Sequence, residues 1–88
     1  MFEVVATNKF ASDFKILPSH IQAKTDIWLN KLRHDPFSLD FPIKKLKGLR
    51  NNFWRLKIDR NYRLIYSVSK NSLILYRIRH RKDIYQKF

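Results

Sequence analysis

Basic side chains alternate with apolar ones in the second half of the chain, where the spacing is typical of β-strands. They are Arg55, Lys57, Arg63, Arg77 and Arg79. Since successive side chains of a strand point to opposite faces, these five should share one face of a sheet. Gathered guanidinium and ammonium groups bind phosphate well, each arginine offering a planar pair of donors. A merely solvent-facing surface would usually mix both signs, yet Asp59 is the only acid on these strands.

The catalytic groups that the chain lacks narrow its chemistry. There is no cysteine, and one glycine cannot build a glycine-rich phosphate loop. The three histidines are far apart and no paired carboxylates accompany the cations, so we expect no metal and no cofactor. RNA cleavage remains possible, because RNA carries its own nucleophile, the 2′-hydroxyl. The protein then has to orient that group, move protons and stabilise the phosphorane, using its cations and Tyr85 or His80.

The net charge of +12 belongs entirely to the second half of the chain. Residues 1–43 hold five bases and five acids, whereas residues 44–88 hold fourteen bases and two acids. This asymmetry predicts a polyanionic partner, either nucleic acid or an acidic protein, although a solvated basic surface would have the same composition. Binding to a membrane surface is disfavoured because the basic half is not an amphipathic helix.

Length and composition predict one domain over residues 1–88. An apolar share of 44% is enough for a modest core. The N-terminus lacks the basic and apolar regions of a secretory signal, and no stretch approaches the roughly 20 apolar residues that span a bilayer. We therefore expect a cytoplasmic protein.

The first half is expected to form a strand and a helical hairpin. Residues 2–6 favour a strand, after which Thr7 or Asn8 can cap a short helix. Pro18 interrupts that helix, and Ser19 can cap a second one that ends at residues 35–36. The second helix carries one apolar stripe, made of Ile21, Thr25, Trp28, Leu29 and Leu32.

The second half predicts a connector and then three antiparallel strands. The connector over residues 35–52 has room for a short strand at residues 43–46. Strands follow at residues 53–59, 62–68 and 73–80, with tight turns at 60–61 and at 70–71, where Asn71 can take a positive φ. Residues 82–88 should form one or two helical turns. The helices must bury their stripe against the sheet, which gives a two-layer α+β fold.

Strand parity assigns side chains to the two faces of this sheet. The face toward the helices should carry Trp54, Leu56, Ile58, Tyr62, Leu64, Tyr66, Ile74, Tyr76 and Ile78. Ile65, Leu73 and Leu75 then fall on the cationic face, where apolar side chains need a cover. That cover is either an acidic, partly helical partner or the C-terminal turn through Ile84 and Phe88.

Two segments resemble the RelE branch of the RelE/ParE toxins. They are KKLKGLRNNFWRLKIDRNYRLIYSV at 44–68, with an L-x-G connector at Leu46–Gly48, and YRIRHRKDIYQKF at 76–88. The strand, helix, helix, strands order covers the whole chain. The resemblance implies a toxin of a type II toxin–antitoxin system, monomeric alone and neutralised by an acidic antitoxin in a heteromeric complex. It also implies metal-independent cleavage of mRNA, usually in the ribosomal A site.

The resemblance also implies site residues. The catalytic set is Lys57, Arg63, Arg79, Tyr85, Arg55 and His80, and RNA binding adds Lys47, Arg77, Arg81 and Lys82. Arg55 departs from the family, which more often has lysine at this position. Arg81 is the other candidate for the arginine assigned to Arg79. Lys57, crowded by cations, is the candidate general base, while Arg63 and Arg79 would hold the scissile phosphate. Arg55 would bind a neighbouring phosphate and Tyr85 would stack on a base or orient the 2′-hydroxyl.

Each of the remaining assignments has an alternative. His80 or Arg81 would aid the leaving group, yet His80 has apolar parity and would equally be a packed histidine. The alternative for Tyr85 is hydrophobic packing within the tail. The chief rival function is a ParE-like toxin that poisons DNA gyrase without catalysis, a branch that typically lacks the basic pair and the tail tyrosine. A plain nucleic-acid-binding module is the third possibility.

Overall fold

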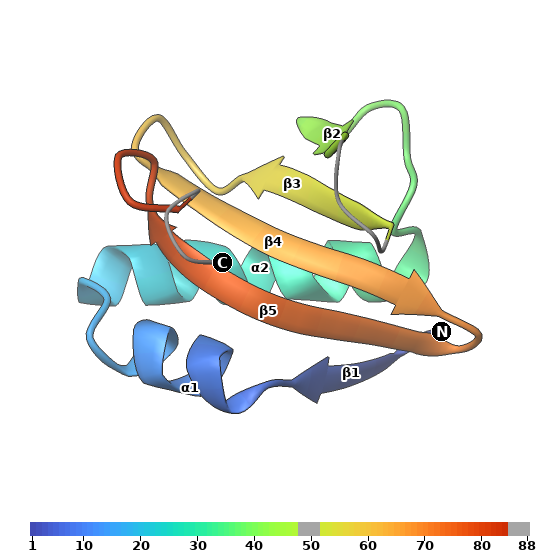
Figure 1. Ribbon diagram of the computed structural model, residues 1–88, viewed down its shortest axis with the longest axis horizontal. Coiled ribbons are helices and arrows are strands. Elements are labelled where there is room, and N and C mark those ends of the chain that lie inside the picture. The colour runs from blue at the N-terminus through green and yellow to red at the C-terminus, as the bar shows by residue number, and fades with distance from the viewer. Residues whose placement is uncertain (48–51, 85–88) are drawn as a thin grey trace.

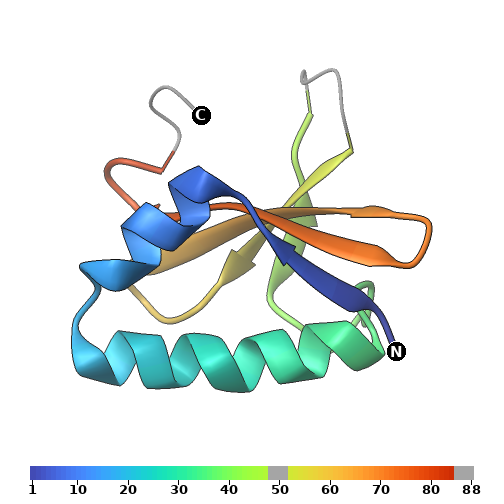
Figure 2. The ribbon, with the colours of Figure 1, turned by 90° about the horizontal axis from the view of Figure 1, so that it is seen from below.

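The computed structural model describes residues 1–47 and 52–84 and shows a five-stranded sheet with two helices (Figure 1). The elements are β1 (Glu3–Ala6), α1 (Asn8–Lys15), α2 (Ser19–His34), β2 (Ile43–Lys45), β3 (Phe53–Lys57), β4 (Tyr62–Ser69) and β5 (Ser72–His80). The strand order is β1-β5-β4-β3-β2. Helix α2 lies along one face of the sheet, as Figure 2 shows edge-on. The predicted α+β fold is confirmed, including the short strand in the connector.

The two helices begin in different ways. The hydroxyl of Thr7 accepts a hydrogen bond from the backbone amide of Phe10, which confirms the predicted cap of α1. The prediction that Ser19 caps α2 is wrong, because Ser19 is already helical. Pro18 holds the cap position in an extended conformation, and its carbonyl accepts the amides of Ile21 and Gln22. Because proline has no side-chain acceptor, α2 begins without a side-chain cap. The fixed φ of Pro18 is compatible with the start of a helix.

Strand β1 and helix α1 together line one edge of β5. β1 pairs in parallel with the first half of β5, from Glu3 opposite Ser72 to Ala6 opposite Leu75. Where β1 ends, α1 continues along the second half of β5: the Thr7 hydroxyl donates to the Tyr76 carbonyl. The edge of β5 is therefore covered along its length, which protects its backbone groups from pairing elsewhere.

A bulge in β5 changes which side chains face the helices. Ile65 pairs with Arg77 and Tyr66 with Leu75, so Tyr76 is an extra residue without a partner across the ladder. The parity predicted for the start of β5 is therefore wrong. Leu73 and Leu75 belong to the core, at 0% and 1% exposure, whereas Ile74 and Tyr76 lie on the opposite face.

The turns also refine the sequence expectation. In the β4–β5 turn the positive φ belongs to Lys70, at 54°, and the prediction for Asn71 is wrong. The β3–β4 loop is closed by Asp59, whose carboxylate accepts the amides of Asn61 and Tyr62. At the C-terminus the amide of Ile84 donates to the His80 carbonyl, which makes one turn. The rest of the helical segment predicted at 82–88 lies outside the described residues.

The core fills the space between α2 and the sheet. Its buried members are Phe10, Ile21, Leu32, Leu56, Ile58, Leu64, Tyr66, Leu73, Leu75 and Ile78. Ile65 and Ile84 are also fully buried but do not belong to this cluster. With Leu73 and Leu75 in the core, Ile65 alone of the three expected apolar residues stays on the cationic face, where the bulge adds Ile74 and Tyr76. Because Ile65 is already buried in the free chain, it needs no partner to cover it.

Candidate functional site

We call the face of the sheet turned away from α2 the open face, and three cations lie across it in one register row. Lys57 on β3 is directly opposite Arg63 on β4, and Arg63 is directly opposite Arg79 on β5. Paired residues of this kind have Cβ atoms about 5 Å apart, so the row spans about 10 Å. Like charges at such spacing destabilise a sheet, which indicates that stability did not select them. We call Lys57, Arg63 and Arg79 the cation row.

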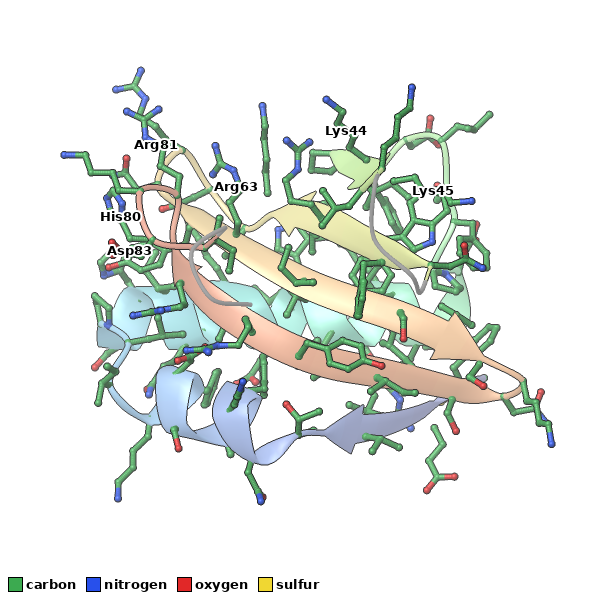
Figure 3. The ribbon with its side chains drawn as sticks, in the orientation of Figure 1. Lys44, Lys45, Arg63, His80, Arg81 and Asp83 are labelled. Atoms are coloured by element: carbon green, nitrogen blue, oxygen red, sulfur yellow. The ribbon has the colours of Figure 1, made fainter. Side chains whose placement is uncertain are left out.

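Arg63 is held in place by the loop that precedes it. One terminal nitrogen of its guanidinium donates to the carbonyls of Asp59 at 2.8 Å, of Arg60 at 3.1 Å and of Tyr62 at 3.1 Å. The residue is only 9% exposed. A long, flexible side chain is thereby fixed before any ligand arrives, which lowers the entropy cost of binding an anion. Figure 3 shows Arg63 at the end of the sheet where the C-terminal turn carries Arg81.

Arg55 lies next to the cation row and carries an unsatisfied donor. It shares the open face with Lys57, two positions away on β3, and is directly opposite Lys44 on β2. Its Nε is buried, with no hydrogen-bond partner within the described part of the chain. Such an orphan donor is costly unless a ligand completes it. Lys44 is exposed and was not predicted as a site residue, although its position in the predicted short strand could have placed it beside Arg55.

Arg77 is engaged elsewhere. Its guanidinium makes a two-pronged ion pair with Asp13 of α1, with nitrogen–oxygen distances of 2.7 and 2.9 Å. Hydrogen bonding to this carboxylate raises the pKa of Arg77. Asp13 also accepts the backbone amide of Ile78 at 3.1 Å. The pair thus fastens α1 to β5, and it engages two of the three guanidinium nitrogens of the residue that the sequence assigned to RNA binding.

His80 lies on the helix side of the sheet, away from the cation row. It is directly opposite Tyr62, and the two rings meet edge to face with centroids 5.5 Å apart. Its Nδ1 accepts the backbone amide of Lys82. It also lines a pocket of about 180 Å³ together with Leu17 and Asp83. These contacts fit the packed histidine considered above.

The remaining predicted residues are peripheral or not described. Arg81 and Lys82 are exposed in the C-terminal turn, and Lys47 is exposed just before the undescribed residues 48–51. Tyr85 lies outside the described residues. In the described ranges no group of three or more histidine, aspartate or glutamate side chains is arranged to hold a metal ion. Nor does any helix there have the length and apolar character needed to cross a membrane.

Comparison with known proteins identifies the family. The profile described as "ParE toxin of type II toxin-antitoxin system, parDE" matches residues 4–85. The chain belongs to this toxin family. It is a toxin of the type II toxin–antitoxin class, as its resemblance to the RelE/ParE toxins predicted.

Individual relatives place this toxin near the RelE branch. It is 31% identical to Toxin RelE3 of Methanocaldococcus jannaschii, with 98% of each chain covered. Its fold matches the toxin in the RelB–RelE antitoxin–toxin complex from Methanococcus jannaschii, with a TM-score of 0.78, 29% identity, and 96% and 98% of the two chains covered. YafQ from E. coli has the same fold, with a TM-score of 0.79 at 13% identity over 97% and 99%.

Proposed function

We propose that this toxin is a metal-independent endoribonuclease that cleaves mRNA and so inhibits translation in the cytoplasm. The observation that carries the proposal is the cation row, in which Lys57, Arg63 and Arg79 are directly opposite one another on three adjacent strands. A phosphate group seated on this row would meet two guanidinium groups and one amine. Like charges in one register row destabilise a sheet, so phosphate binding accounts for the row better than stability does, even though Arg63 also closes the β3–β4 loop.

The proposed reaction uses the nucleophile of the substrate. The 2′-oxygen attacks the adjacent phosphorus and gives up its proton to Lys57, the proposed general base. Arg63 and Arg79 stabilise the charge that develops on the phosphorane oxygens. The bond from phosphorus to the 5′-oxygen then breaks, which leaves a 2′,3′-cyclic phosphate and a 5′-oxygen that takes up a proton. Tyr85 is proposed to orient the 2′-hydroxyl or stack on a base.

Arg55 is proposed to bind the next phosphate of the same strand. It lies about 7 Å from Lys57 along β3, since two residues of a strand rise about 3.3 Å each. Its buried, unpartnered Nε would gain an acceptor from that phosphate. Arg81 is proposed to aid the leaving group by stabilising its negative charge while water supplies the proton, because His80 faces the helices. Lys47, Arg81 and Lys82 would add general attraction for RNA.

An acidic antitoxin is the proposed protein partner. The RelE toxins of Methanococcus jannaschii and Pyrococcus horikoshii OT3 were solved as complexes with RelB. The excess of positive charge in residues 44–88 suits a partner of opposite sign. We propose that the toxin alone is a monomer and that the antitoxin covers the cation row.

The decisive experiment measures mRNA cleavage in a reconstituted translation mixture, with and without ribosomes. Lys57→Met and Arg79→Gln should each lower the cleavage rate at least a hundredfold, since removing a general base or one charge-stabilising donor costs about 10²–10³ in rate. Lys24→Met is the matched control, because Lys24 is an exposed lysine on α2. Growth arrest with intact mRNA and inhibited supercoiling would instead support the gyrase-poisoning function.

A further inference from the structure

The open face carries a second feature at the end remote from the cation row. Phe53 on β3 and Tyr76 on β5 meet edge to face, with ring centroids 4.8 Å apart and planes at 82°. Between them on β4 lies Ser67, whose hydroxyl donates to the tyrosine oxygen at 3.1 Å. Ser67 and Tyr76 also line a pocket of about 300 Å³, together with Asn52, Val68, Ser69 and Ile74. Its size is at the small end for ligand sites.

The β5 bulge is what brings Tyr76 to this face. Without the extra residue, the parity of Ile78 would put Tyr76 among the core side chains. The bulge instead leaves Tyr76 partly exposed beside Ile74 and Ser67. Bulges often re-aim a side chain next to a functional site. Here the re-aimed side chain is an aromatic ring surrounded by an amide and hydroxyl groups.

We propose that this pocket binds a nucleobase of the RNA strand whose phosphates lie on the cation row. An aromatic ring offers a stacking surface that any base can use. The Asn52 amide can donate and accept, and the hydroxyls of Ser69 and Tyr76 can do so too, which matches the polar edge of a base. Charge favours a neutral base of RNA over an acidic peptide as the occupant, because none of the described lining residues is a cation that could pair with a carboxylate.

The distance between the two features sets the position of the base. Ser67 and Arg63 lie on the same face of β4, four residues apart, which is about 13 Å. A stacked strand rises about 3.4 Å per nucleotide and an extended one rises more, so the base lies about two to four nucleotides from the scissile bond. The inference rests on the proposed function, because the cation row fixes the strand. The base pocket adds a contact to one base at a distance from the cation row.

The test combines protein variants with abasic RNA. After the cut site is mapped with the wild-type toxin, short single-stranded RNAs are made with a 2′-deoxynucleotide at the cut and an abasic residue at each other position in turn. One abasic position two to four nucleotides from the cut should weaken wild-type binding about tenfold, the scale of one base–aromatic stack. Tyr76→Leu should bind intact RNA about tenfold more weakly and lose sensitivity at that position alone. Tyr76→Phe should retain it.

One further variant and three contrasting outcomes keep the result interpretable. Asn52→Ala changes an exposed residue outside any strand, so it should fold normally and alter which base is preferred there. If a toxin that still cleaves RNA binds every abasic RNA equally well, the base pocket is overturned and the proposed function stands. The base pocket is also overturned if binding by Tyr76→Leu is weakened at the same abasic position as binding by the wild-type toxin. If the wild-type toxin leaves RNA intact, the ribonuclease proposal is overturned, and the pocket stands if an abasic scan of unmodified RNA still shows one sensitive position that Tyr76→Leu loses.

Discussion

Replacing Asp13 with alanine should destabilise the fold strongly, because this carboxylate has three partners on β5. Its oxygens accept two hydrogen bonds from the Arg77 guanidinium and one from the Ile78 amide. The side chains of Arg77 and Asp13 are 15% and 10% exposed. Breaking a buried ion pair costs about 3–5 kcal/mol, and partial rehydration of this guanidinium reduces that to about 2 kcal/mol. The unsatisfied amide adds about 1 kcal/mol.

The expected loss of about 3 kcal/mol is large for a small domain, whose unfolding free energy is about 5–15 kcal/mol. It corresponds to a fall in Tm of about 12–24 °C, since 1 kcal/mol shifts Tm by about 4–8 °C at this size. Urea unfolding followed by tryptophan fluorescence measures the loss directly. Asp26→Ala is the matched control, because Asp26 is an exposed carboxylate in the middle of α2 and the same helix-favouring residue replaces it.

A double-mutant cycle tests the assigned cause. In an Arg77→Met background, Asp13→Ala should cost only about 1 kcal/mol, because the ion pair is already gone and the Ile78 amide alone loses its partner. The reasoning is refuted if Asp13→Ala costs no more than Asp26→Ala. It is also refuted if the cost of Asp13→Ala is the same with and without Arg77.

Four further outcomes are expected for Tyr66, Ile84 and Lys57. Tyr66→Phe removes a buried hydrogen bond of 2.8 Å to the Pro36 carbonyl and should cost about 1–2 kcal/mol in urea unfolding. Burial, helped by the charge of Asp35, raises the pKa of Tyr66, so the unfolded chain ionises first and stability should fall as pH rises above about 10, less so in Tyr66→Phe. Ile84→Ala should cost about 2–5 kcal/mol, because Ile84 is fully buried; a cost below 1 kcal/mol would show that the C-terminal turn is not anchored. Lys57→Met should make the slope of log affinity for single-stranded RNA against log salt concentration shallower by about 0.7. An unchanged slope would place Lys57 away from phosphate.

Local patterns were enough to predict most of the elements and part of the site. The alternation of Trp54, Arg55, Leu56 and Lys57 predicted both faces of β3, because strand parity depends only on neighbouring residues. The same rule placed Arg63 and Arg79 on the open face. The stripe of α2 was read correctly for the same reason, since a helix repeats every 3.6 residues whatever it packs against.

Contacts between distant parts of the chain settled the rest. The extra residue at Tyr76 exists only relative to β4, so parity within β5 could not reveal it, and it moved Leu73 and Leu75 into the core. Asp13 and Arg77 are 64 residues apart, and no local pattern pairs them. Local patterns assign each side chain to a face of its own element, whereas register, bulges and ion pairs depend on how the elements pack. The row of Lys57, Arg63 and Arg79 needed both: parity chose the face, and register aligned the three side chains.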